Sequence, residues 1–138
     1  MNLDQLAAKL AENIAEQAKH EVDVLERLAT KALGVLQTQG VYALMLFLFS
    51  RSKSEEKVSQ AIRNQLIAGI YEAGIVDNQQ DEMPDEHNAQ ATLQFFSEKI
   101  AGGNLDALLF IRDLYEQALI YTRYLAKALE GTSTKSGS

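Results

Sequence analysis

The sequence predicts an all-α fold, a single-domain bundle of about five or six helices. Apolar residues recur every three or four positions over long stretches, which is the spacing of one face of a helix. Pro84 is the only proline, so long helices can run without interruption. Hydrophobic residues make up 46% and charged residues 23% of the 138 residues, the balance of an ordinary globular domain. We expect the bundle in residues 1–130 and a flexible tail in residues 131–138.

Residues 2–40 predict one long helix, or two helices broken near His20. Asn2 can serve as the N-cap, and Gln5 completes a weak capping box. Gly40 follows the last periodic position and is expected to end this region, because glycine readily adopts the conformation that terminates helices. The apolar stripe comprises Leu3, Leu6, Leu10, Ile14, Ala18, Val22, Leu25, Leu28, Ala32 and Leu36.

The segment Val41–Phe49 is apolar on every side. Its leucines and methionine favour a helix over a strand. A helix that is apolar all round is buried all round, so we expect it at the centre of the bundle or under an interface. Its length is about half of what a membrane-spanning helix needs. We therefore expect a cytoplasmic protein with no membrane contact.

The next helix is expected to start at Ser52 or Ser54, because serine is a favoured N-cap. Gly74 is well placed to end it. Residues 76–87 are acidic, polar and aperiodic, which indicates a surface loop.

The bounds of the last two helices are predicted from one proline, two glycines and one asparagine that can serve as an N-cap. Pro84–Asp85 can open the first of them, and Gly102–Gly103 ends it. Asn104 caps the final helix, which continues to near Glu130.

The sequence contains no motif for catalysis, a cofactor or a metal. The absence of cysteine excludes disulfides, cysteine–zinc sites and a thiol nucleophile. His20 and His87 belong to no metal-binding spacing, and the glycines form no phosphate-binding loop. The acidic loop lacks the residue order and glycine of a calcium-binding EF-hand. We therefore expect a protein that is not an enzyme, needs no cofactor and takes no small-molecule substrate.

The net charge of −6 comes from one segment of the chain. Six of the 19 acidic residues lie within residues 72–86, where no basic residue occurs. The remaining 13 acidic residues are equal in number to the 13 basic residues of the chain. The overall acidity therefore does not exclude a nucleic-acid partner.

Basic residues gather at one helix junction and on the last helix. Solvated surface is the ordinary interpretation of such a cluster. The alternative is contact with nucleic-acid phosphates, which would be independent of sequence and sensitive to salt. The candidates for phosphate contact are Arg51, Lys53, Lys57, Arg63, Arg123 and Lys127.

Tyrosines crowd the last helix. Tyr115 lies on its apolar stripe, whereas Tyr121 and Tyr124 cannot both lie on it. At least one tyrosine is therefore expected on the surface, where tyrosine often anchors an interface. A partly buried tyrosine with its hydroxyl in water is the alternative. The candidates for a subunit interface are Tyr121, Tyr124, Glu72, Asp81 and Glu82.

Two segments together resemble the small helical subunit of Cmr-type (type III-B) CRISPR effector complexes. Residues 25–44, LERLATKALGVLQTQGVYAL, are similar to a family region in which a helix ending in Asn-Gly leads into a buried helix. Residues 115–129, YEQALIYTRYLAKAL, resemble the family's C-terminal helix. Gln39 stands where the family favours asparagine, Tyr124 where it has tryptophan, and the family's Lys-Arg pair is reduced.

The resemblance implies a non-catalytic structural subunit that functions in antiviral defence. Copies of such a subunit stack head-to-tail along the complex, contact its backbone subunits, and help to hold the duplex of crRNA and target RNA. Head-to-tail stacking needs two different surfaces on each copy. The basic 51–63 junction and the acidic 72–87 segment are candidates for this pair of surfaces. The alternative is a helical protein–protein interaction adaptor or a homo-oligomer with no role in nucleic-acid binding.

Overall fold

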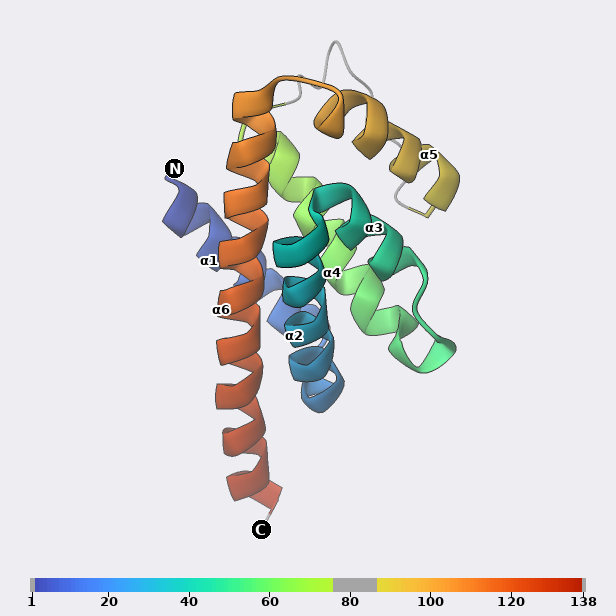
Figure 1. Cartoon of the computed structure of the whole chain (residues 1–138). Coiled ribbons are helices and arrows are strands. Elements are labelled where there is room, and N and C mark those ends of the chain that lie inside the picture. Colours follow the sequence, from blue (N-terminus) through green and yellow to red (C-terminus); the bar gives the residue numbers. More distant parts are fainter. Residues whose placement is uncertain (1, 76–86, 138) are drawn as a thin grey trace.

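The computed structural model describes residues 2–75 and 87–137, with side-chain environments up to residue 131. These residues form only helices, which confirms the predicted all-α bundle (Figure 1). In chain order they are α1 (Leu3–Gln17), α2 (Val22–Gln39), α3 (Val41–Phe49), α4 (Lys53–Glu72), α5 (Ala89–Phe95), the π-helix η1 (Phe96–Ala101) and α6 (Leu105–Gly137). No helix in the described ranges is both long and apolar enough to cross a membrane.

The first predicted stripe forms two helices, with the break between Gln17 and Val22. The capping box at the start of α1 is present. The Asn2 side chain accepts a hydrogen bond from the Gln5 backbone N–H at 2.8 Å, and the Gln5 side chain accepts one from the Asn2 N–H at 3.3 Å. These two bonds satisfy backbone donors that the helix itself leaves unpaired.

Glycines end two helices, as predicted. Gly40, with φ of 97°, separates α2 from α3 and changes the direction of the chain. Gly74, with φ of 73°, follows α4, and its N–H donates to the Tyr71 carbonyl at 2.9 Å. The Ile75 N–H donates to the Ile70 carbonyl at 3.3 Å, which completes a Schellman motif. Both positions require φ above zero, which favours glycine over residues with a Cβ.

Helix α6 packs along α1 and α2, and α1 also packs against α4. Tyr115 of α6 is fully buried, and its hydroxyl donates to the Leu66 carbonyl of α4 at 2.7 Å. Burial raises the pKa of the Tyr115 hydroxyl well above its ordinary value. At Gly69, an added Cβ would lie only 2.8 Å from Cδ1 of Leu10. The core therefore lies among α1, α2, α4 and α6, and it extends to buried residues of α3 and η1.

Helix α3 is not buried on every side within the chain, so the prediction that it lies at the centre of the bundle is wrong, while burial under an interface stays a prediction. Val41, Leu44, Met45 and Leu48 are buried, but Tyr42 is 39% and Leu46 43% exposed. Helix α3 packs on α2, α4, α5 and η1, and these neighbours leave one of its faces uncovered. An all-apolar sequence indicates what a helix can bury, but the number of neighbouring helices decides how much of it is covered.

The last helices differ from their predicted bounds. Helix α5 begins at Ala89, with Asn88 as its N-cap, and not at the predicted Pro84–Asp85, which lies outside the described residues. It continues into η1, where the Gly102 N–H donates to the Ser97 carbonyl at 3.1 Å. Asn104 caps α6 as predicted. Its side-chain oxygen accepts hydrogen bonds from the backbone N–H groups of Asp106 and Ala107.

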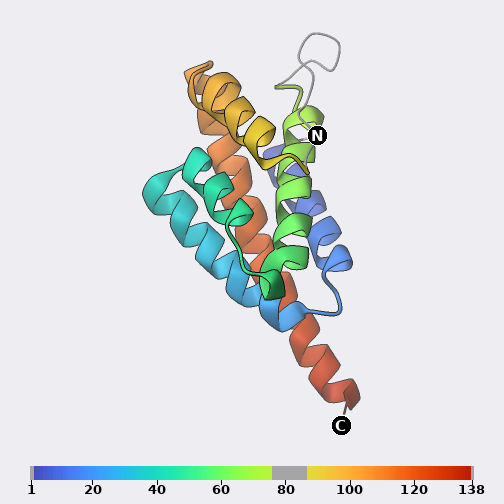
Figure 2. The same ribbon diagram turned by 90° about the vertical axis from the view of Figure 1, so that its right-hand side faces the viewer.

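Helix α6 also continues through residues 131–137, which were predicted to be a flexible tail. No proline interrupts this segment, and adding one residue to an existing helix is far easier than starting a new one. The end of α6 projects beyond the other helices in both views of the molecule (Figures 1 and 2).

Candidate interaction surfaces

Side chains that could bind a metal are scattered over the described part of the chain. No group of three His, Asp or Glu side chains there could hold a metal ion. His20 is exposed in the turn between α1 and α2. His87 lies beside Gln60, with 3.1 Å between the ring Nδ1 and the amide nitrogen of Gln60. The two histidines therefore contribute to no common site.

Arg51 lies at the C-terminal end of α3 and makes its contacts there. Its Nε donates to the Phe47 carbonyl at 2.9 Å, and its guanidinium carbon lies 3.8 Å from the centre of the Phe47 ring. The Glu55 carboxylate lies 3.8 Å from its Nη1. A cation at this end of a helix is stabilised by the helix dipole. Arg51 thus has three local partners that compete with any phosphate.

Arg63 is not on the surface that a phosphate contact requires. It lies on α4 and is only 4% exposed, so the prediction that it contacts a phosphate is wrong. Its Nη2 donates to Glu56 Oε1 at 2.9 Å, and its guanidinium carbon lies 4.4 Å from the centre of the Phe49 ring. Its Nε and Nη1 are buried without a hydrogen-bond partner among the described residues. The carboxylate and the aromatic ring together stabilise the buried charge.

Lys53 and Lys57 are exposed on the first turns of α4. They are one helical turn apart, so their side chains leave the same face of the helix. Neither forms an ion pair with another described residue. Lys57 also borders a shallow hollow of about 230 Å³. The other lining residues are Gln17, Gln60, Ala61 and Asn64.

Arg123 and Lys127 form a second pair, one turn apart on α6. Arg123 is half-buried and Lys127 is exposed. Thr122 and Ala126, which precede them by one residue each, are fully buried. The two cations therefore lie about 100° around α6 from these buried residues, on a flank of the helix.

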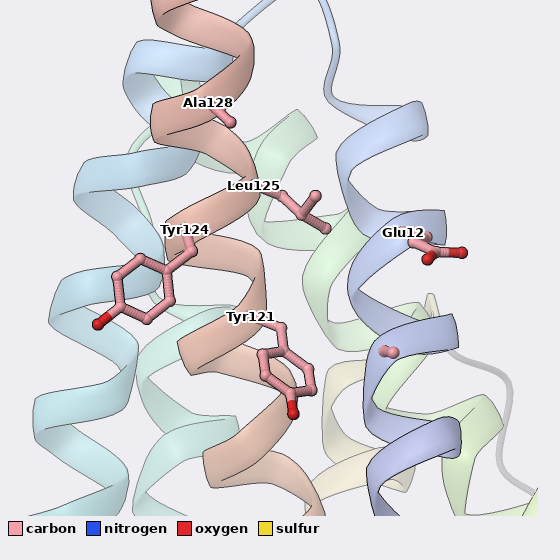
Figure 3. Close-up of a pocket in the computed structure, with 6 residues that line it drawn as sticks. Glu12, Tyr121, Tyr124, Leu125 and Ala128 are labelled. Atoms are coloured by element: carbon pink, nitrogen blue, oxygen red, sulfur yellow. The ribbon is translucent and has the colours of Figure 1, made fainter.

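A groove of about 410 Å³ lies between α1 and the second half of α6 (Figure 3). Leu125 points from α6 toward α1, while Tyr124 stands at the outer edge of α6 and is 64% exposed. The walls are mostly apolar, with the Glu12 carboxylate at the α1 side. The lining residues are Ala8, Glu12, Tyr121, Tyr124, Leu125 and Ala128. An open apolar groove of this kind is typical of a binding surface.

Tyr121 connects the groove to the start of α1. It is half-buried, and its hydroxyl donates a hydrogen bond to Asp4 Oδ1. This bond to the carboxylate is the main reason why the pKa of Tyr121 is raised above its ordinary value. The prediction of at least one exposed tyrosine is confirmed by Tyr124, and Tyr115 is the buried one.

The acidic half of the predicted interface is described only at Glu72. Its carboxylate pairs with Lys9 Nζ at 3.0 Å and so links α4 to α1. Asp81 and Glu82 lie outside the described residues. Arg63 is buried, and Arg51 and Glu72 are paired within the chain. These three charges are therefore not free to pair the 51–63 junction of one copy with the 72–87 segment of another.

Two leucines at the start of α6 are exposed, which the sequence did not predict. Leu105 is 66% and Leu109 50% exposed, one turn apart. Leu105 lies three residues before Leu108 and ten before Tyr115, a spacing that predicts a place on the apolar stripe of this helix. The first turn of α6 extends past the helices that cover its later residues, and no signal in the local sequence reveals this.

No protein-family model, curated protein or solved structure matches this chain.

Proposed function

We propose that the chain is a non-catalytic small subunit of a type III (Cmr-type) CRISPR effector complex. In this role it stacks along the complex and helps to hold the duplex of crRNA and target RNA. The observation that carries the proposal is the presence of two pairs of accessible cations on rigid helices. Lys53 and Lys57 lie on α4, and Arg123 and Lys127 lie on α6.

These cations suit contact with phosphates rather than with bases. Lysine presents a compact charge on a flexible chain, which neutralises a phosphate without selecting a base. Arg123 and Lys127 stand beside Tyr124, whose exposed ring offers an apolar surface next to the charges. A subunit that positions RNA for others needs sequence-independent contacts, because base pairing with the guide selects the target.

Copurification tests the assignment to a complex. The tagged chain is expressed together with the genes that neighbour its own, and the bound proteins and RNA are identified by mass spectrometry and sequencing. We expect backbone subunits and a small RNA of defined length to copurify. A chain that elutes without these subunits and without RNA contradicts the proposal.

Salt dependence tests the phosphate contacts. Removing the two α4 charges with the double substitution Lys53→Ala and Lys57→Ala is expected to weaken RNA binding by the assembled complex. The slope of log K against log salt should fall by about 1.4 to 1.8, which corresponds to two lost phosphate contacts. Lys31→Ala, an exposed lysine on α2, is the matched control and should leave the slope unchanged. Equal slopes for all three proteins would remove the α4 pair from the RNA surface.

The alternative function is a helical interaction module with no nucleic-acid role. The groove between α1 and α6 favours it, because an apolar groove suits a protein partner at least as well as RNA. This function predicts a defined protein complex in which no RNA is retained and whose assembly does not depend on Lys53 or Lys57.

A further inference from the structure

We infer that the groove between α1 and α6 docks an amphipathic helix of a partner protein, one that carries lysine or arginine beside its apolar face. Three features of the molecule point to this occupant: an apolar floor, an acidic rim, and an apolar strip that continues along α6. Such a site is additional to the proposed function and needs no RNA, because Arg123 and Lys127 do not line the groove and lie on the other flank of α6.

The floor of the groove is apolar and comes from both helices. Tyr121 and Leu125 extend from α6 toward α1, and the ring of Tyr124, which is 64% exposed, forms the outer edge (Figure 3). Ala8 of α1 and Ala128 of α6 also line the groove. Because their side chains are small, a docked helix can approach both walls closely.

The apolar surface continues along α6 past the residues that line the groove. Leu129 lies one helical turn after Leu125, so it leaves the same face, and its side chain is 39% exposed. It lies toward the end of α6 that projects beyond the other helices (Figures 1 and 2). From Tyr121 to Leu129 the strip is about 12 Å long, at 1.5 Å per residue. A partner that covers the whole strip therefore needs about two helical turns.

The two walls favour a helical occupant over an extended one. Both walls are helices, whose backbone N–H and C=O groups already bond within each helix. The groove therefore offers no strand edge to which an extended segment could add. A helix satisfies its own backbone groups and presents apolar side chains at three- and four-residue spacing, which suits an elongated apolar groove.

The charged side chains at the groove are acidic, and they select a basic partner. Glu12 lines the α1 side, is exposed, and forms no ion pair with another described residue. Asp4, which is also exposed, accepts a hydrogen bond from the hydroxyl of Tyr121, another lining residue. A lysine or arginine beside the apolar face of the partner would therefore meet carboxylates at this rim.

The basic residues nearest to the rim in the sequence are already paired elsewhere. Lys9 of α1 and Lys19, which follows α1, each lie 3.0 Å from a carboxylate that does not line the groove. No basic residue is among those that line it. The rim therefore keeps its negative charge, which opposes an acidic partner as much as it attracts a basic one.

The experiment uses three synthetic peptides of about 18 residues, or five helical turns, that share one amphipathic pattern. The basic peptide has leucine on one face and lysine on the other. The acidic peptide has glutamate in place of every lysine, and the polar peptide has serine in place of every leucine. Binding of each peptide to the full chain is measured by fluorescence anisotropy, and its position is mapped by amide chemical-shift changes in NMR spectra.

The groove variant carries Tyr124→Ala and Leu129→Ala. Its matched control carries Tyr42→Ala and Leu46→Ala on α3, which also removes one exposed tyrosine and one exposed leucine. Circular dichroism melting checks that both proteins are folded.

The rim variant is Glu12→Gln. Its matched control is Asp113→Asn, which removes one exposed carboxylate that lies on α6 outside the groove. The two proteins have the same net charge, so a difference between them cannot come from the overall acidity of the chain.

We expect the basic peptide to bind, with shift changes concentrated in residues 8–12 and 121–129. The acidic and polar peptides should bind at least about tenfold more weakly, because each lacks one of the two features that the groove recognises. The groove variant should also lose at least about tenfold in affinity for the basic peptide. The rim variant should lose about two- to fivefold, and less at high salt. Both controls should bind as the wild type does.

Five outcomes overturn the inference: no binding of the basic peptide, equal binding of the acidic or the polar peptide, a groove variant that binds as the wild type does, loss of binding in a control, or shift changes confined to other residues. Two further outcomes overturn it by naming another occupant. Self-association in sedimentation velocity that the groove variant abolishes assigns the groove to a second copy, and displacement of the peptide by oligouridine assigns it to RNA.

The proposed function is tested separately. Its salt-dependence measurement varies Lys53 and Lys57, which do not line the groove. Copurification without effector subunits or RNA would remove that function and leave peptide binding in place, whereas failure of the peptide experiment would leave the function standing.

Discussion

The two halves of α6 continue one helix in very different surroundings. In the first half, Tyr115 is enclosed by α4 and the neighbouring helices. In the second half, Tyr124 stands in solvent at the edge of a groove. The same residue type therefore stabilises the core at one position and offers a contact surface at the other. The number of neighbouring helices, rather than the local sequence, therefore decides the role of each of these two tyrosines.

The largest expected effect is at Tyr115. Replacing it with alanine removes a fully buried ring, and we expect the free energy of unfolding to fall by about 3–5 kcal/mol in urea denaturation. Tyr115→Phe, which removes only the hydroxyl bonded to the Leu66 carbonyl, should cost about 1 kcal/mol. Tyr124→Ala should change the free energy by less than about 0.5 kcal/mol. Equal losses at Tyr115 and Tyr124 would abolish the contrast between the two halves.

Gly103 tests how the first half of α6 begins. A Cβ at this position would lie 2.3 Å from the Lys99 backbone carbonyl oxygen, so Gly103→Ala must displace the backbone. We expect a loss of about 1–3 kcal/mol in the same denaturation measurement. Gly131→Ala in the second half is the control, since nothing lies within 4 Å of its added Cβ. Alanine there should leave stability unchanged or raise it by up to about 1 kcal/mol.

The same contrast recurs on α4, between the buried Arg63 and the exposed Lys57. Glu56→Ala removes the carboxylate that, among the described residues, pairs with Arg63, whose side chain is 5% exposed. We expect a loss of about 1–2 kcal/mol, less than for a fully buried pair because Glu56 itself is 45% exposed. Lys57→Ala, measured by the same thermal or urea unfolding, should stay within about 0.5 kcal/mol of the wild type. A larger effect at Lys57 than at Glu56 would contradict the assignment of these two environments.

Tyr121 is half-buried, between the buried Tyr115 and the exposed Tyr124, and we expect its contribution to stability to be the smallest of those considered. Its pKa is raised mainly by the hydrogen bond to Asp4, so ionisation of its hydroxyl is harder in the folded chain than in the unfolded one. The bond therefore contributes its full stability below the ordinary pKa of tyrosine, near 10, and this contribution is lost as pH rises through the raised value.

The measurement is the phenolate absorbance of the wild type minus that of Tyr121→Phe, titrated upward from neutral pH. We expect the midpoint to lie above 10 and to move down in Asp4→Ala. If Asp4→Ala leaves the midpoint where it was, the hydrogen bond is not the cause of the shift.

Local patterns predicted much of the fold. The helix ends at Gly40 and Gly74 and the caps at Asn2 and Asn104 depend on backbone geometry within a few residues, which the sequence encodes directly. The π-helix after α5 was not predicted, because no periodic signal in the sequence marks it; Phe95 and Phe96, where α5 continues into η1, are both buried.

The candidate surfaces were less predictable. Charge alone placed Arg63 beside Lys57 in one basic cluster, although its stem and guanidinium pack between Glu56 and Phe49. Apolar spacing alone places Leu105 on the buried stripe of α6, although its side chain is 66% exposed. Both errors have one cause: a residue's type states what it can bury or bind, and its exposure depends on segments that are distant in the sequence.

The helical bundle, several of its helix ends and the residues able to form its core follow from local sequence patterns. The uncovered apolar faces and the accessible cations follow from how the helices pack. Hydrogen bonds within a helix are local, whereas burial is a property of the whole packing. The groove beside Tyr124 is such a feature, because its lining among the described residues comes from two helices that are distant in the sequence, α1 and α6.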